Sequence, residues 1–239
     1  MKSVRALRGV SDNLVVVLIA LFGVLLLVNQ YYLSSVVAVL GSPSKFTTGS
    51  AVSFLSFKSK GGDLTDVDLS AIKSTGHSVA AVFPVDKIKT QQDAVDIMIP
   101  SGTPAYGAQL GVSFDDPVPS LARLAQIFTE VQMTPEQNQR WLNLVLKPVG
   151  ISCEYCCGVG PIGATSDGRS KCGCQHNPAL LGLSKWLVVN TDMNDAEVLR
   201  ETLRWKALFF PKNMVELAMQ VAGGDTSKLE NLPGMVGGC

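Results

Sequence analysis

The chain has 239 residues, which is room for one mid-sized domain with attached segments, since domains most often run to about 100–150 residues. Twenty basic residues balance twenty acidic ones without forming a basic stripe, so we expect no nucleic-acid binding, which requires clustered Lys and Arg. The hydrophobic content of 46% excludes a wholly disordered protein, and the presence of only one long apolar stretch excludes a polytopic membrane protein.

That apolar stretch lies near the N-terminus and predicts a single membrane span. Residues 14–28 carry no charged or polar side chain, and residues 14–33 would form a transmembrane helix with Tyr31 and Tyr32 at the membrane interface. Basic residues precede the span and are absent directly after it. By the positive-inside rule, residues 1–13 form a cytoplasmic tail and the rest of the chain is exported.

Three interpretations of this segment remain open. An uncleaved anchor in the cytoplasmic membrane is favoured, because the apolar region of a cleavable signal peptide is expected to be only about 7–15 residues long. A signal peptide would use the small-residue site at residues 36–38. Residues 8–11 also resemble an archaeal prepilin processing site, and cleavage after Gly9 would make residues 14–28 a filament-core helix.

The exported part is predicted to be mainly α-helical. Residues 34–63 are rich in Ser, Gly and Thr and indicate a linker, with one short strand near residues 52–57 left open. A helical domain is expected over residues 64–223. The tail, residues 224–239, is predicted to be disordered, with Cys239 available for an intermolecular disulfide.

Local signals place five helices from residue 120 onward. The expected segments are residues 120–131, residues 135–147 after a Thr134/Gln137 capping box, a helix from Pro178 with Asn177 as N-cap, residues 195–210 after an Asn194/Glu197 capping box, and residues 211–223. Trp205, Phe209 and Phe210 are expected in the core.

Residues 64–150 carry little recognisable chemistry. The carboxylates Asp66, Asp68, Asp115 and Asp116 lack the spacing of a calcium loop and are interpreted as turn and cap residues. His77 has no cysteine or second histidine near it in sequence and is interpreted as an ordinary turn residue.

Residues 150–177 form a Gly- and Cys-rich segment, here called the knuckle, that carries the candidate site. Cys153 and Cys156 have the C-x2-C spacing that lets two thiolates of one turn reach the same ion. Cys172, Cys174 and His176 alternate and form a second ligand arm. The candidate metal ligands are Cys153, Cys156, Cys157, Cys172, Cys174 and His176.

Zn²⁺ is the expected ion, with Cu(I) as the alternative, because thiolate and imidazole ligands suit both. Export of the domain favours disulfides instead, in which case the knuckle would be a stapled surface or assembly module without a cofactor. A third possibility is a thiol-disulfide oxidoreductase that uses Cys153 and Cys156, which requires an exposed pair with a low-pKa thiol.

The motifs CEYCC at residues 153–157 and KCGCQHNPALLGL at residues 171–183 are similar to those of membrane-anchored prokaryotic proteins with a CxxCC and CGCxH pattern. They also resemble the PCYCGC-motif family, whose contiguous motif is divided here between residues 155–157 and residues 172–174. The resemblance implies a surface-anchored, cysteine-rich domain and supplies no catalytic residues.

The sequence therefore predicts a single-pass membrane protein that exposes a helical metal-binding domain, with the metal in a structural or metal-handling role. No hydrolase elbow, zincin motif or phosphate-binding loop is present, so a binding protein is expected rather than an enzyme. A protein partner, or self-association through the membrane helix or Cys239, remains open.

Overall fold

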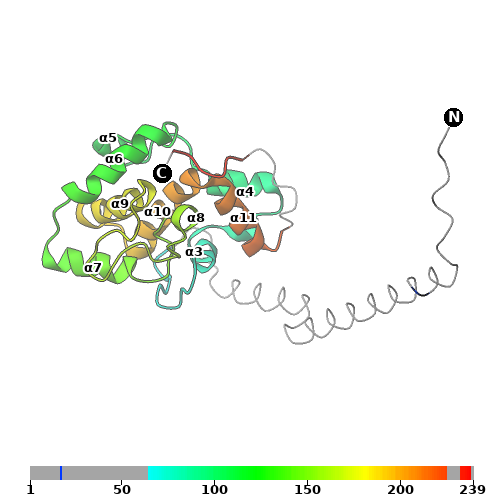
Figure 1. Cartoon of the computed structure of the whole chain (residues 1–239), viewed down its shortest axis with the longest axis horizontal. Helices are drawn as coiled ribbons and strands as arrows, with labels where there is room; N and C mark the ends of the chain where they lie inside the picture. The colour runs from blue at the N-terminus through cyan, green and yellow to red at the C-terminus, as the bar shows by residue number, and fades with distance from the viewer. Residues whose placement is uncertain (1–16, 18–63, 225–231, 238–239) are drawn as a thin grey trace, which may run out of the picture. The chain divides into compact units, whose positions relative to one another are not determined.

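A computed structural model describes Val17, residues 64–224 and residues 232–237 (Figure 1). The chain divides into two compact units, Met1–Ser50 and Ala51–Cys239, and every described residue except Val17 belongs to the second.

Apart from Val17, the predicted membrane helix at residues 14–33 and the predicted linker at residues 34–63 lie outside the described residues. In the part of the chain that the structure does describe, no helix combines the length and apolarity needed to cross a bilayer.

The described part of the second unit is mainly helical, as predicted. Its elements in chain order are α3 (Thr75–Val82), the 3-10 turn η1 (Val85–Lys87), α4 (Gln91–Met98), α5 (Gly107–Leu110), α6 (Pro117–Glu130), α7 (Pro135–Val145), α8 (Glu154–Cys157), α9 (His176–Asn190), α10 (Asp195–Phe209) and α11 (Pro211–Ala222). Within residues 64–224 strand-like pairing is limited to two isolated bridges, Ile151 with Ile162 and Ala164 with Ser170.

Helices with strong local signals begin and end close to their predicted limits. In α7 the side chain of Thr134 accepts from the N–H of Gln137 and the Gln137 side chain accepts from the N–H of Thr134. Asn194 and Glu197 form the same reciprocal box at the start of α10. Gly223 ends α11 with a φ of +79°, a left-handed conformation that favours glycine.

Two predicted helix starts are corrected by the structure. Helix α6 begins at Pro117, three residues before the predicted start at residue 120, because a proline is well suited to the first helical turn. Helix α9 begins at His176, with Gln175 at the N-cap position and no side-chain cap. Asn177 is therefore not an N-cap, because its side chain bonds within the knuckle.

The first half of the domain contains short helices that local sequence signals do not predict. Helix α4 begins with a capping box between Thr90 and Asp93. His77, predicted in a turn, lies in the first turn of α3. The turn interpretation of the acidic residues holds for Asp68, which accepts from the N–H of Ser70 at 2.8 Å.

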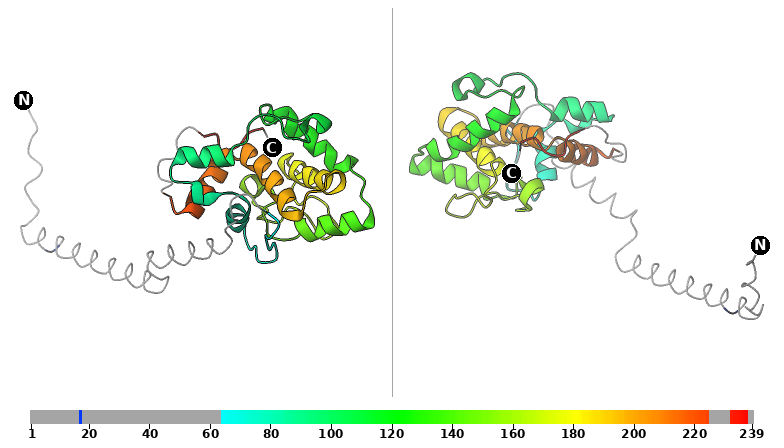
Figure 2. Two further views of the ribbon diagram at one scale, coloured as in Figure 1. Left: turned by 180° about the vertical axis from the view of Figure 1, so that it is seen from behind. Right: turned by 45° about the horizontal axis from the view of Figure 1, so that its top comes forward.

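Helix α9 lies at the centre of the fold. It contacts α6, α7 and α10, while α11 packs on α3, α4 and α10; the yellow and orange helices lie side by side in both views of Figure 2. Trp205, Phe209 and Phe210 are fully or almost fully buried, as predicted. The knuckle packs on this core through His176, whose ring contacts the rings of Phe209 and Phe210.

Part of the predicted disordered tail is ordered against the domain. The N–H of Val236 donates to the carbonyl oxygen of Phe209 at 2.8 Å, and the N–H of Lys212 donates to that of Pro233 at 3.2 Å. Residues 232–237 therefore contact α10 and α11, which corrects the predicted disorder for this segment.

Gly182 sets the close approach of α9 and α6. A Cβ atom at this position would clash with the carbonyl oxygen of Leu124 and would lie 2.7 Å from the backbone nitrogen of Phe128. Gly182→Ala is expected to lower the free energy of unfolding by about 1–3 kcal/mol, because the helices must separate. The higher helix propensity of alanine would by itself raise the free energy of unfolding by about 1 kcal/mol. The sign of the measured change therefore distinguishes close helix packing from helix propensity.

Thermal and chemical unfolding of the full-length protein would measure this change. Gly234→Ala is the control, because a Cβ there meets nothing within 4 Å. We expect the control to change stability by less than about 0.5 kcal/mol. A stabilised Gly182→Ala variant would contradict the packing argument.

Candidate metal centre

The first cysteine arm is a single helical turn. Cys153 directly precedes α8, and its carbonyl oxygen accepts from the N–H groups of Cys156 at 2.9 Å and Cys157 at 3.3 Å. Gly158 ends the turn in the left-handed conformation, with a φ of +65°. The turn directs the cysteines differently, so that Cys153 is fully buried and Cys157 is exposed.

A buried ion pair attaches this arm to the core. Nζ of Lys206 in α10 lies 2.7 Å from Oε1 of Glu154 in α8 and donates to the carbonyl oxygen of Gly150 at 2.8 Å. Thr75 in α3 donates its hydroxyl to the same Glu154 oxygen at 2.7 Å. Burial lowers the pKa of Lys206, and the Glu154 carboxylate opposes that shift. Groups from α3 and α10 thus converge on one carboxylate of α8.

Asn177 joins the two cysteine arms. Its Oδ1 accepts from the N–H of Cys153 at 3.2 Å, while its Nδ2 donates to the carbonyl oxygen of Gly163 at 2.8 Å and to the hydroxyl of Ser170 at 2.6 Å. The side chain is fully buried. These bonds satisfy a backbone donor on the first arm and two groups of the segment between the arms, and Asn177 itself directly follows the second arm, so its side chain fixes the arms relative to each other.

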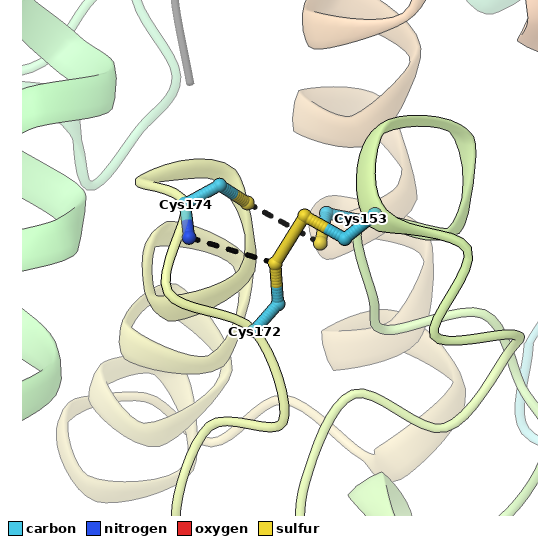
Figure 3. Close-up of side chains that lie close together, drawn as sticks. Cys153, Cys172 and Cys174 are labelled. Atoms are coloured by element: carbon cyan, nitrogen blue, oxygen red, sulfur yellow. Dashed lines mark hydrogen bonds between the residues drawn. A yellow bond between two sulfur atoms is a disulfide. The ribbon is translucent and has the colours of Figure 1, made fainter.

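Four sulfurs from the two arms converge at the start of α9. The ligand atoms of Cys153, Cys157, Cys172 and Cys174 all lie within 4.8 Å of one another. The sulfurs of Cys153 and Cys174 are 3.3 Å apart, and Cys157 and Cys172 are joined by a disulfide. Figure 3 shows the Cys174 sulfur facing that of Cys153, which comes from a separate segment, and the backbone N–H of Cys174 facing the Cys172 sulfur at 3.5 Å.

The four sulfurs form a buried inner pair and a more accessible outer pair. The inner thiols, Cys153 and Cys174, are free and buried, whereas Cys157 is exposed and Cys172 is half-buried. Burial raises the pKa of the Cys153 thiol to about 12, and the adjacent Cys174 adds to the shift through a hydrogen bond and its charge. In the absence of a metal the Cys153 thiol is therefore protonated, and both inner thiols are buried.

This asymmetry predicts different thiol reactivity in metal-free protein. After mild reduction, iodoacetamide is expected to modify Cys157 and Cys172 at least about tenfold faster than Cys153 and Cys174, because only a solvent-accessible thiolate reacts. Peptide mass spectrometry with and without denaturant measures the rates. Equal rates for Cys153 and Cys157 in folded protein would contradict the buried inner pair.

His176 belongs to a second, overlapping group. A ring nitrogen of His176 and the sulfurs of Cys156 and Cys174 lie within 4.8 Å of one another. His176 is fully buried, its Nε2 lies 2.9 Å from the carbonyl oxygen of Val236, and its Nδ1 has no hydrogen-bond partner. Cys174 is common to both groups, which places it at the centre of the candidate site.

The four-sulfur group has the size of a tetrahedral metal site. Four thiolates bound to zinc at about 2.3 Å lie about 3.8 Å from one another, along the edges of the tetrahedron. The observed span of up to 4.8 Å is close to that value, so the group could hold a metal ion. The Cys157–Cys172 disulfide is the competing state of the same sulfurs, because a disulfide sulfur is not a thiolate ligand.

The structure brings together all six ligand candidates predicted from the sequence, but in two groups. It also reveals two positioning features that are not among the predictions from the sequence, the Asn177 side chain and the Glu154–Lys206 pair. The sequence does carry a signal for Lys206, because it falls on the apolar stripe of α10 with Leu199 and Leu203. The hydrogen bonds of Asn177 reach residues up to 24 positions away. No local sequence pattern therefore predicts them.

The oxidoreductase prediction fits this geometry poorly. It requires an exposed Cys153–Cys156 pair with a low-pKa thiol, whereas Cys153 is buried, its pKa is raised, and its near neighbour is Cys174. In the structure Cys157 is joined to Cys172 and Cys156 is itself disulfide-bonded, whereas Cys153 is free, so Cys153 and Cys156 do not pair with each other.

Fold and site together define a helical domain with a buried cysteine cluster that could hold a metal ion or be closed by a disulfide. No family model, curated protein or solved structure matches the chain.

Proposed function

We propose that this protein is a metal-binding protein in which reduced Cys153, Cys157, Cys172 and Cys174 hold one Zn²⁺ ion. The convergence of these four sulfurs within 4.8 Å, from two arms fifteen or more residues apart in sequence, is the observation that carries the proposal. Four thiolates complete the tetrahedral shell of zinc and leave no open position for a substrate. The metal would therefore be structural and would fix the knuckle on the core.

The proposal includes a location. A membrane anchor at residues 14–33 with the helical domain exported is supported by the apolar sequence and by the basic residues that precede it. Protease treatment of intact cells tests this arrangement: an exported domain is degraded without lysis, and a protected domain contradicts export.

Metal stoichiometry tests the proposed site. Full-length protein in detergent, reduced under anaerobic conditions and equilibrated with Zn²⁺, is expected to retain about one zinc ion per chain after removal of free metal. The Cys157→Ser, Cys172→Ser double variant is expected to retain none, because two of four ligands are lost. Elemental analysis measures the ratio.

Cys156→Ser is the matched control, because Cys156 is adjacent in sequence to Cys157 but lies outside the four-sulfur group. It is expected to retain zinc. If reduced wild-type protein binds no zinc, the proposal fails and the alternative gains support, namely a module stapled by the Cys157–Cys172 disulfide observed in the structure.

A further inference from the structure

The disulfide form of the centre retains three metal donors, all of them buried. When Cys157 and Cys172 are joined, the free thiols of Cys153 and Cys174 remain 3.3 Å apart. A ring nitrogen of His176 lies within 4.8 Å of the Cys174 sulfur, in a group that includes Cys156 and not Cys153, so Cys174 is the donor that links the inner pair to His176. The disulfide therefore removes the outer half of the four-sulfur group and leaves the inner half intact.

The hydrogen bond of His176 determines which nitrogen is available. Nε2 lies 2.9 Å from the carbonyl oxygen of Val236. A carbonyl oxygen only accepts hydrogen bonds, so Nε2 carries the proton and Nδ1 of the neutral ring carries the lone pair. Nδ1 is the only buried side-chain nitrogen or oxygen without a partner among the described residues.

Such an atom requires an explanation, because leaving a buried acceptor unpaired costs about 1–3 kcal/mol. The same arrangement is typical of metal-ligating histidines, in which the second ring nitrogen donates to a backbone carbonyl and fixes the ring orientation. The Val236 carbonyl has this role here, and it comes from the ordered segment of the C-terminal tail.

We propose that the disulfide form of the protein binds Cu(I) through Cys153, Cys174 and Nδ1 of His176, which makes metal selectivity depend on the redox state of Cys157 and Cys172. This inference rests on the proposed function, since it treats the same cluster as a metal centre. With only three protein ligands Zn²⁺ needs a water as its fourth ligand, which the burial of all three donors opposes, whereas soft thiolates select Cu(I).

The chemistry balances without an added oxidant. Cu(I) keeps its oxidation state, the Cys153 and Cys174 thiols each release one proton as they bind, and the outer disulfide is unchanged. Conversion to the zinc form requires a dithiol reductant: its two thiols become a disulfide, and the Cys157–Cys172 bond takes up the two electrons and two protons.

Anaerobic competition with a chromogenic Cu(I) chelator tests the proposal on full-length protein with the Cys157–Cys172 disulfide confirmed by mass spectrometry. We expect about one Cu(I) per chain. Cys153→Ser, Cys174→Ser and His176→Gln are each expected to weaken Cu(I) binding by about tenfold or more, as loss of a ligand requires. Unchanged Cu(I) affinity in His176→Gln would overturn the proposed ligand set.

X-ray absorption of the wild-type copper complex gives a second test that needs no variant. Two sulfur ligands and one nitrogen ligand are expected, and a shell of sulfur only would overturn the assignment of His176. Failure of the disulfide form to take Cu(I) from the chelator would overturn the inference itself.

The Cys157→Ser, Cys172→Ser double variant separates this inference from the proposed function. It is expected to bind Cu(I) like the disulfide form and to bind no Zn²⁺. Zinc binding by reduced wild-type protein without copper binding by this variant would refute the inference alone. Copper binding without any zinc binding in the reduced protein would refute the zinc proposal alone.

Discussion

Lys206→Met is expected to lower the free energy of unfolding by about 3–5 kcal/mol, the range measured when one partner of a buried ion pair is removed. Lys206 is fully buried and is the cationic partner of Glu154 at 2.7 Å. Its removal leaves the Glu154 carboxylate, whose side chain is 15% exposed, without a counter-charge. The carbonyl oxygen of Gly150 also loses its donor from Lys206.

Chemical unfolding of the full-length protein measures this effect. Lys212→Met is the matched control, because Lys212 lies six residues further along the chain and is exposed. Adding Glu154→Gln to Lys206→Met is expected to recover part of the loss, since the buried charge is removed and an acceptor for the Thr75 hydroxyl remains. A loss below about 1 kcal/mol in Lys206→Met would show that the pair does not hold the first arm.

Zinc is expected to stabilise the reduced protein by about 4 kcal/mol when its free concentration is a thousandfold above the dissociation constant. The reason is that the four ligands converge only in the folded chain, so that binding energy becomes folding energy. Cys174→Ser is expected to lose this stabilisation, because Cys174 belongs to both ligand groups.

Unfolding curves with Zn²⁺ and with a chelator, under reducing and anaerobic conditions, measure the gain. Cys156→Ser is expected to keep the gain, since its sulfur lies outside the four-sulfur group. An equal shift in wild-type protein and Cys174→Ser would mean that zinc acts elsewhere on the chain.

Both proposed states of the centre follow from one structural asymmetry. The outer cysteines are accessible and joined in a disulfide, while the inner cysteines are buried and free. An oxidant or reductant from solvent therefore reaches Cys157 and Cys172 first. The inner pair with His176 persists in either state, so we expect the redox state to change which metal binds without emptying the centre.

Local signals in the sequence were sufficient for much of the fold. Capping boxes at Thr134 and Asn194 and the glycine after α11 placed α7, α10 and α11, because these signals act within a few residues of a helix end. Short helices such as α3 were not predicted, since eight residues carry little periodicity and their stability comes from tertiary packing.

The candidate site was predicted in composition but not in arrangement. Residue type and spacing identified all six ligand candidates, because C-x2-C and alternating Cys and His residues are local patterns. The sequence by itself thus determined a helical domain with a sulfur-rich centre. Only the tertiary structure decided that Cys153 faces Cys174, that Asn177 joins the arms, and that Val236 fixes the His176 tautomer. Those contacts join residues 21 to 60 positions apart, and such pairings depend on the packing of α9 and α10 rather than on any local preference.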